Sequence, residues 1–261
     1  MVRGENLLSA YGKSVELHGA GRETGEGKLA KIDELRSVGL FETLPQAVLA
    51  RLQSITRVIT ANPDEVLCRQ GTMPEFLHVL LEGQVALSST ATDGTTAVVE
   101  VIRPGGHFVL ASVLAELPYL MSAYSVGRSR LLAIDAVGLL QLAEEEPLLS
   151  VTLLRSVSRE FRTMVRQVRD LKLRTAAQRL GCYLLALVRD GEAAESDFRL
   201  PFEKGLLAAR LGCRQENLSR AFATLRDYGV ETHGARVILH NIPKLKAFAV
   251  PDDDVSELEA V

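Results

Sequence analysis

The stretch GLLAARLGCRQENLSRAFATLRDYGV, residues 205–230, has the pattern of two short helices joined by a tight turn. Apolar residues recur at helical spacing on both sides of Gly212, which can supply the turn. A helix-turn-helix unit also needs a small residue where the helices cross, and Ala208 fits that position. The apolar residues predicted to lock the angle between the helices are Leu207, Leu211, Leu218 and Phe222.

The first turns of the second predicted helix are crowded with hydrogen-bonding side chains. Glu216, Ser219 and Arg220 are spaced i, i+3 and i+4, so they share one helix face. Arginine can donate a bidentate pair to guanine, glutamate can accept from cytosine N4, and glutamine can pair with adenine. We therefore predict a face that reads base edges in the major groove of double-stranded DNA. A helical hairpin with an ordinary polar surface is the alternative.

A wing is predicted directly after this unit. The segment GVETHGARVILH, residues 229–240, reads as two strands around His233-Gly234-Ala235, and it would place Arg236 or His233 near phosphate. The winged helix-turn-helix domain is predicted to span residues 172–250. The predicted DNA-binding set is Arg214, Gln215, Glu216, Ser219, Arg220 and Arg236.

The charge distribution agrees with a DNA-binding end. The chain carries a net charge of −3, yet residues 172–249 hold 13 Lys and Arg against 8 Asp and Glu. A basic C-terminal third attached to an acidic remainder of the chain is typical of a DNA-binding domain joined to a domain with a second function. No nucleophile elbow, zinc-binding HExxH or glycine-rich phosphate loop occurs, so an enzyme is not expected.

Cysteine spacing and hydropathy indicate the cellular compartment of the protein. Cys68, Cys182 and Cys213 lie far apart, which excludes a zinc or iron–sulfur framework that is local in sequence and fits a reduced compartment. No apolar run approaches the length of a membrane helix, and the N-terminus lacks a signal-peptide core. We expect a cytoplasmic protein with no membrane partner and no metal site.

An α+β fold is predicted, with a β-roll sensor domain over residues 28–143. The pattern is helical to about Arg57, and then short apolar runs alternate with turn signals through Asp135. Such spacing indicates an antiparallel sandwich or barrel. The turn signals are Pro63-Asp64, Asp93-Gly94 and Pro104-Gly105-Gly106. A mobile glycine-rich arm is expected over residues 1–27 and an acidic tail over residues 251–261.

One long helix is predicted over residues 144–171, with Glu144 to Glu146 at its N-terminus and Pro147 in its first turn. A second helix is predicted to begin at Thr175, which forms a capping box with Gln178, so the domain boundary falls at Lys172 to Thr175. Apolar residues in the long helix are spaced 3, 4, 3, 4, 3, which is an a/d seam. The seam can be a dimer interface or a stripe packed on its own domain. Its residues are Leu154, Val157, Phe161, Met164, Val168 and Leu171.

From about Leu40 to Phe248 the chain resembles the family of the cyclic-AMP receptor protein and the fumarate-and-nitrate-reduction regulator. The resemblance rests on GLFETLP, PDEVLCRQG, EFLHVLLEGQVAL, RPGGHF and VRDLKL, followed by the winged helix-turn-helix. It implies a cytoplasmic homodimeric transcription activator, paired through the long helices, with DNA and RNA polymerase as partners. The pattern Glu-x-x-Ser-Arg at Glu216, Ser219 and Arg220 is similar to the fumarate-and-nitrate branch. That branch implies a TTGA-type half-site in an inverted repeat.

The sensor departs from the family's cyclic-nucleotide cassette. The family pattern is Phe-Gly-Glu-Leu followed by Arg-Ser-Ala, where the Glu holds the ribose and the Arg holds the phosphate. Here FVLASVL (108–114) and LMSAYSV (120–126) place Ala at the Glu position and Met at the Arg position. A buried phosphate would lose its charge partner, so we expect no cyclic AMP or cyclic GMP. The predicted effector pocket, suited to an apolar or haem-like molecule, is formed by Leu110, Ala111, Val113, Met121 and Ser122.

The family includes other sensing modes. The arm lacks the cysteine cluster of the oxygen-sensing branch, so no iron–sulfur cluster is expected, and the haem histidine of the carbon-monoxide sensor aligns with Ala111. The denitrification and nitric-oxide branch remains, with haem as a candidate cofactor. A thiol switch at Cys213 and a regulator without effector are the alternatives. Candidate haem ligands are His18, His78, His107, Met121 and Cys68.

Overall fold

The structure is a computed structural model that describes residues 27–92, 96–188, 195–200 and 204–250. The chain divides into two compact units, Met1–Arg162 and Thr163–Val261. The division lies inside the longest helix, α6 (Pro147–Leu173), and therefore earlier than the boundary expected at Lys172 to Thr175. The predicted arm, the acidic tail, His18 and the Asp93-Gly94 turn signal lie outside the described residues.

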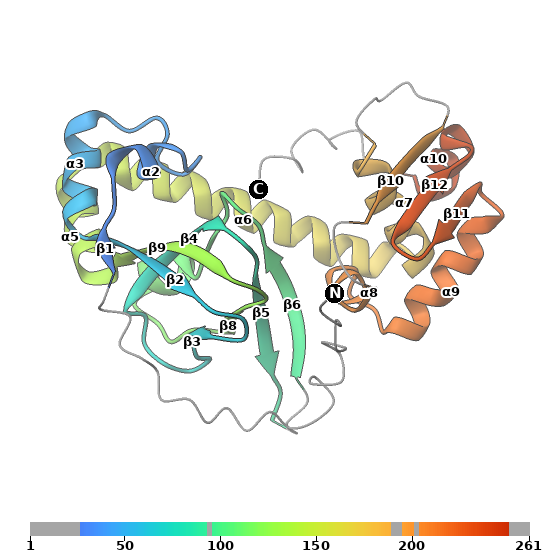
Figure 1. Ribbon diagram of the computed structural model, residues 1–261, viewed down its shortest axis with the longest axis horizontal. Coiled ribbons are helices and arrows are strands. Elements are labelled where there is room, and N and C mark those ends of the chain that lie inside the picture. The colour runs from blue at the N-terminus through green and yellow to red at the C-terminus, as the bar shows by residue number, and fades with distance from the viewer. Residues whose placement is uncertain (1–26, 93–95, 189–194, 201–203, 251–261) are drawn as a thin grey trace, which may run out of the picture. The chain divides into compact units, whose positions relative to one another are not determined.

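Two antiparallel sheets form the N-terminal unit (Figure 1). The five-stranded sheet has the order β1 (Lys28–Leu29), β2 (Thr56–Ala61), β9 (Ser129–Asp135), β4 (Phe76–Glu82) and β7 (His107–Phe108). The four-stranded sheet has the order β3 (Val66–Cys68), β8 (Ser122–Ser125), β5 (Val85–Thr90) and β6 (Thr96–Ile102). The predicted β-roll is confirmed.

The five-stranded sheet is buried on both faces, because side chains alternate between two apolar clusters. On β4, Leu77 and Val79 join a cluster with the helices, whereas Leu80 joins a cluster shared with the second sheet. On β9, Leu132 faces the helices and Leu131 faces the second sheet. We call the cluster between the two sheets the roll interior, and His78, on the same side of β4 as Leu80, lies against it.

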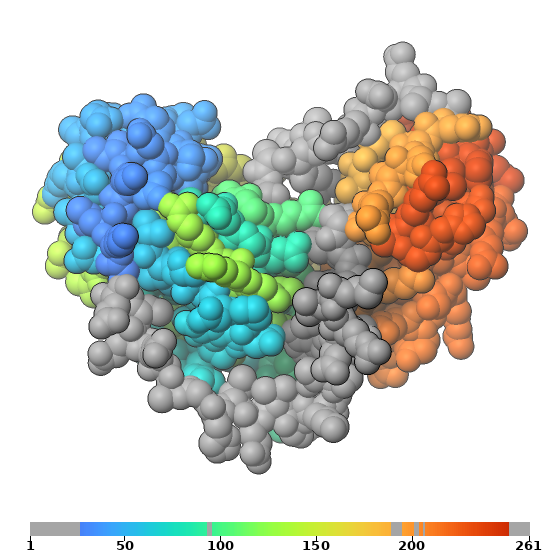
Figure 2. All heavy atoms as spheres, in the orientation of Figure 1, coloured from blue at the N-terminus to red at the C-terminus, as the bar shows by residue number. Residues whose placement is uncertain are grey.

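Helices cover the other face of the five-stranded sheet. They are α2 (Ile32–Arg36), α3 (Gln46–Ser54), α4 (Leu110–Ala115), α5 (Ala136–Glu145) and the first part of α6. Atoms of α2 and α3, blue in Figure 2, gather at one end of this unit. The predicted helical segment before Arg57 contains α2 and α3, but residues 37–45 between them form turns, β1 precedes them, and β2 already begins at Thr56.

The predicted start of the long helix at Glu144 is wrong. Glu144 and Glu145 end α5, Glu146 lies between the two helices, and α6 begins at Pro147. Proline has no N–H to donate and its fixed φ suits a first turn, so the chain can break after Glu146 and restart there. The backbone N–H groups of Leu149 and Ser150 then bond to the Glu146 carbonyl.

The C-terminal unit contains four further helices, α7 (Ala176–Ala186), α8 (Lys204–Arg210), α9 (Gln215–Arg226) and α10 (Ile242–Ala249). Its antiparallel sheet has the strand order β10 (Ser196–Arg199), β12 (Arg236–Leu239) and β11 (Val230–His233). The capping box between Thr175 and Gln178 is present, as predicted. The sequence prediction included the β11–β12 hairpin but missed β10, which pairs with β12 in full register.

Candidate nucleic-acid interface and effector region

The helix-turn-helix unit is built as its sequence predicts. Leu207, Ala208, Leu211, Leu218 and Phe222 are all buried in one apolar cluster with α7 and the sheet of this unit. The turn between α8 and α9 passes through Gly212 at φ +60°, a left-handed conformation that suits glycine. The Cys213 N–H donates to the Ala208 carbonyl at 3.0 Å, which closes the turn.

The outer face of α9 is exposed and polar. Arg214 is the N-cap residue, with an extended backbone and no side-chain capping bond, so its guanidinium is not used by the helix. None of the predicted base-reading side chains makes a hydrogen bond or ion pair with any part of the chain that the structure describes. These side chains belong to Gln215, Glu216, Ser219 and Arg220, all exposed. The face is free to accept base edges.

The wing holds its charged groups in ion pairs. Arg236, predicted to contact phosphate, donates from Nε to Asp197 Oδ1 at 2.9 Å, and its Nη2 also bonds to this carboxylate. His233 and His240 each lie 2.7 Å from the carboxylate of Glu231. The pKa of Asp197 is lowered by its hydrogen bond to Arg236, and the pKa of Glu231 is lowered by its bonds to His240 and His233. The sequence prediction missed the Asp197 partner because it lies on β10, the strand that was not predicted.

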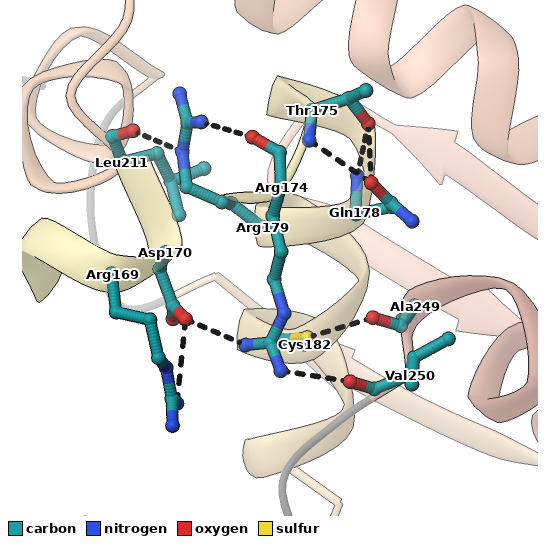
Figure 3. A network of polar contacts seen from close by, with 10 residues as sticks. All are labelled: Arg169, Asp170, Arg174, Thr175, Gln178, Arg179, Cys182, Leu211, Ala249 and Val250. Carbon is teal, nitrogen blue, oxygen red and sulfur yellow. Dashed lines mark hydrogen bonds and ion pairs between the residues drawn. The ribbon is translucent and has the colours of Figure 1, made fainter. Parts of the chain in front are cut away.

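Two arginines tie the end of α6 to the helix-turn-helix, as Figure 3 shows. Arg179 donates from Nε to the carbonyl of Leu211 at 2.9 Å and from Nη1 to the carbonyl of Arg174 at 2.7 Å. Arg174 in turn bonds to Asp170 Oδ1 at 3.0 Å and to the carbonyl of Val250 at 2.8 Å. The segment expected to be a hinge, Lys172 to Thr175, is thus braced on both sides within the C-terminal unit.

The predicted effector-pocket residues do not share one cavity wall. Leu110 and Val113 are buried in the cluster between the sheet and the helices, whereas Met121 packs against the roll interior. Ala111 is exposed on the first turn of α4, and Ser122 Oγ accepts a bond from the Gln70 N–H at 3.0 Å. The prediction that these residues face one pocket fails because Leu110 and Val113 share the buried face of α4, Ala111 lies on its exposed face, and Met121 and Ser122 belong to the separate segment at the start of β8. Only Met121 and its neighbours reach the roll interior.

The candidate haem ligands differ in whether their ligating atoms are available. Both ring nitrogens of His107 are engaged, Nε2 with Ser156 Oγ at 2.6 Å and Nδ1 with Glu160 Oε1 at 2.9 Å. Burial raises the pKa of the Cys68 thiol to about 11, so it stays protonated. His78 and Met121 remain, both against the roll interior. No group of three or more His, Cys, Asp or Glu side chains suited to a metal ion occurs among the described residues.

The predicted seam of α6 is largely exposed. Val157 packs against the helix-side cluster, but the other five seam residues, Leu154, Phe161, Met164, Val168 and Leu171, are 46–64% exposed. A different face of α6, with Leu149, Leu153 and Ser156, is buried in the N-terminal unit. The alternative that the seam packs on its own domain is therefore disfavoured. No helix in the described ranges is both long and apolar enough to span a bilayer.

Comparison with known proteins agrees with this architecture. Residues 58–146 match the cyclic nucleotide-binding domain family, and residues 178–248 match the Crp-like helix-turn-helix domain family. The chain is 22% identical over 217 residues to a CRP-like cAMP-activated global transcriptional regulator of Mycobacterium tuberculosis, covering 81% of this chain and 96% of that protein. It is 29% identical over 161 residues to a cyclic AMP receptor protein of Thermus thermophilus, covering 62% of this chain and 73% of that protein.

A crystal structure of a candidate cyclic nucleotide-binding protein from Ruegeria pomeroyi has a TM-score of 0.57 and 29% identity, covering 85% of this chain and 97% of that chain. The matching domains occur here in the same order as the β-roll and the winged helix-turn-helix described above. The relatives are transcription regulators and not enzymes. The chain belongs to the CRP/FNR family and is a DNA-binding transcription regulator.

Proposed function

We propose that this regulator works as a homodimer that reads a TTGA-type inverted repeat and responds to a small molecule in the β-roll that is not a cyclic nucleotide. The observation that carries the dimer is the exposed apolar seam of α6. Leu154, Phe161, Met164, Val168 and Leu171 form a stripe of a kind that soluble proteins rarely leave open to water. Pairing with the same stripe of a second copy would bury it in a coiled-coil arrangement.

The two-fold symmetry of such a dimer sets the DNA target. Two α9 helices would enter successive major grooves, so the half-sites should lie roughly 34 Å apart. In each half-site Arg220 would donate to guanine and Glu216 would accept from cytosine, with Gln215 and Ser219 beside them. Arg214, the N-cap residue of α9, would meet phosphate. The branch assignment rests on Glu216, Ser219 and Arg220, which are exposed on α9.

The effector is proposed to lack a phosphate, although relatives of this chain are named for cyclic AMP. A cyclic phosphate needs a fixed cation, and the positions of the family's Glu and Arg are occupied by Ala111 and Met121. No Lys or Arg is among the buried residues of the described part of the chain. The interior offers apolar surface instead, which suits an apolar effector.

Haem is the second candidate effector, and the observation that favours it is the position of His78 and Met121 against the same apolar cluster. Haem would supply an iron centre able to bind nitric oxide, and His78 would hold the iron. A thiol switch is less well supported, because burial raises the pKa of Cys213 and so disfavours the reactive thiolate. We place the protein in the cytoplasm, with RNA polymerase as its partner at promoters.

The decisive experiment measures DNA affinity by fluorescence anisotropy on a TTGA-type palindrome and on the same duplex with one half-site scrambled. A homodimer that reads both half-sites binds the palindrome far more tightly. Calorimetry with cyclic AMP and cyclic GMP at millimolar concentration should give no saturable heat. Micromolar binding that also changes DNA affinity would return the chain to the cyclic-nucleotide branch. An absorption spectrum taken with added haem tests the second candidate through its Soret band.

A further inference from the structure

His78, in the middle of β4, is a buried polar residue without a hydrogen-bond partner. Its side chain is 1% exposed, and neither ring nitrogen bonds to any residue that the structure describes. The ring stacks on Phe108, with centroids 5.1 Å apart and planes inclined by 5°, and meets Phe76 edge-on at 6.1 Å. Buried polar groups in proteins are nearly always paired, so this imidazole requires an explanation.

Packing alone does not explain a histidine at this position. His78 lies between Phe108 on β7 and Ala133 on β9, and both neighbours belong to the apolar roll interior. A phenylalanine or leucine could fill the same volume without burying two unpaired polar atoms. The imidazole therefore contributes something other than volume, and its two ring nitrogens offer hydrogen-bonding groups to a molecule that enters the roll.

The chemistry of the free edge defines what it can recognise. Burial lowers the pKa of His78 to about 4, so the ring is neutral at pH 7 and offers one N–H donor and one lone pair. No Lys, Arg, Asp or Glu is among the buried residues in the described ranges, so the interior suits an uncharged ligand. Phe108, stacked on the imidazole, and Phe76, edge-on to it, supply aromatic surface that favours a flat ring. The partly buried side chains of Leu67, Val109 and Met121 pack against this interior.

We propose that His78 is the effector-recognition residue of the β-roll and that it hydrogen-bonds to a neutral, flat aromatic molecule bearing one hydroxyl group. This assignment rests on the apolar effector of the proposed function and names its chemical class. His78 takes the part that the missing charged cassette would take for a cyclic nucleotide. The ligand is selected by one hydrogen bond inside apolar surroundings instead of by an ion pair.

The position of β7 connects this site to α6. Phe108 stacks on His78 on one side of the strand, and the adjacent His107 bonds to Ser156 and Glu160 of α6 on the other. Val109, the next residue, has φ +64°, a left-handed conformation that costs energy for a β-branched side chain. A ligand that displaces the Phe108 ring would therefore move a two-residue strand that is followed by this left-handed residue and whose other face is bonded to α6.

The test uses phenol and toluene, two molecules of similar size that differ in the hydroxyl. The full-length protein is labelled with ¹⁵N, and the ring nitrogens of His78 are followed by long-range ¹H–¹⁵N correlation during titration. Phenol should produce a saturable shift of a His78 nitrogen and bind about tenfold more tightly than toluene. His78→Phe should reduce the affinity for phenol to that for toluene, while His78→Gln, which keeps a donor and an acceptor, should retain part of the preference.

His107→Gln is the matched control, because His107 lies one residue from Phe108 but faces α6; it should leave the preference for phenol unchanged. Equal affinity for phenol and toluene, no saturable binding of either, or a preference that survives His78→Phe would each overturn the proposal. A Soret band on adding haem that disappears in His78→Phe would assign His78 to iron and also overturn it. The titration contains no DNA, so its result is independent of whether the palindrome is bound.

Discussion

Leu171, in the last turn of α6, packs against Gly212, in the turn between α8 and α9. A β-carbon added to Gly212 would lie 2.6 Å from Cδ2 of Leu171, a separation too short for real carbon atoms. The end of α6 therefore contacts the helix-turn-helix directly. The contact adds to the bonds that Arg179 and Arg174 make across the same junction. Leu171 thus combines a place in the exposed seam with a contact to the DNA-reading unit.

We expect Gly212→Ala to destabilise the C-terminal unit by about 1–2 kcal/mol, because the left-handed backbone at φ +60° disfavours a β-carbon. The close approach to Leu171 adds little, because Cδ2 is the far end of a flexible, half-exposed side chain that can turn away. Gly234→Ala is the matched control, because Gly234 has φ +62° but no atom within 4 Å of its would-be β-carbon, and it should lose a similar amount. Urea unfolding measures both variants. A much larger loss at Gly212 would mean that Leu171 is held in place against the turn.

Phe161→Glu should dissociate the proposed homodimer. Each copy would bring a carboxylate into an apolar seam, at a cost of at least about 2 kcal/mol per dimer. Sedimentation velocity at micromolar concentration should then report a monomer. Gln167→Glu introduces the same charge change on an exposed position of α6 outside the seam, and it should remain dimeric. A dimer that withstands Phe161→Glu would place the interface elsewhere.

Arg220→Ala should weaken binding to the TTGA-type palindrome by about 1–3 kcal/mol and relax discrimination at the paired guanine. Arg214→Ala, one residue before α9, should weaken specific and random duplexes alike, because a phosphate contact carries no sequence information. Anisotropy titrations on both duplexes at fixed salt separate the two effects. If Arg220→Ala lowers both affinities equally, Arg220 does not read a base.

The wing carboxylate Glu231 should titrate below its ordinary range. Its pKa is lowered first by the hydrogen bond to His240 and then by that to His233. Because the folded pKa lies below the unfolded one, the pairing stabilises the wing above the unfolded pKa and is lost as the pH falls through the folded value. NMR titration of the Glu231 carboxyl should show a higher carboxyl pKa in His240→Ala and in His233→Ala, because each substitution removes a hydrogen bond of 2.7 Å. An unchanged pKa in both variants would contradict the pairing.

The local sequence pattern was sufficient to predict the helix-turn-helix. Leu207, Leu211, Leu218 and Phe222 repeat at helical spacing around one glycine, and the structure buries all four as predicted. The capping box at Thr175 is equally local, since both partners lie within four residues. The β-roll could be predicted as a class from its turn signals, because alternation and turn chemistry are properties of short segments.

The errors come from relationships between distant segments. Ser196 to Arg199 carries little strand signal of its own, and only pairing with β12 makes it β10 and brings Asp197 to Arg236. The effector-pocket prediction took the positions of the family's cyclic-nucleotide cassette as one wall, but Leu110 and Val113 pack in the helix-side cluster whereas Met121 packs against the roll interior. His78 lies on β4 between β7 and β9, and the side chains of these three strands surround its ring. The absence of a hydrogen-bond partner depends on that packing and cannot be predicted from spacing in the sequence.

The division of the chain inside α6 determines how its parts can be exchanged. A recombinant swap that joins the DNA-binding end at Thr175, after α6, would leave Leu171 and Asp170 behind. Leu171 contacts Gly212 in the turn of the helix-turn-helix, and Asp170 bonds to Arg174, which in turn bonds to the carbonyl of Val250 after α10. A swap joined at Thr163 would carry those contacts along. The transferable module therefore includes the last eleven residues of α6, Thr163 to Leu173, and sensors of this architecture can be re-paired with new readers only if the graft point lies within a helical segment.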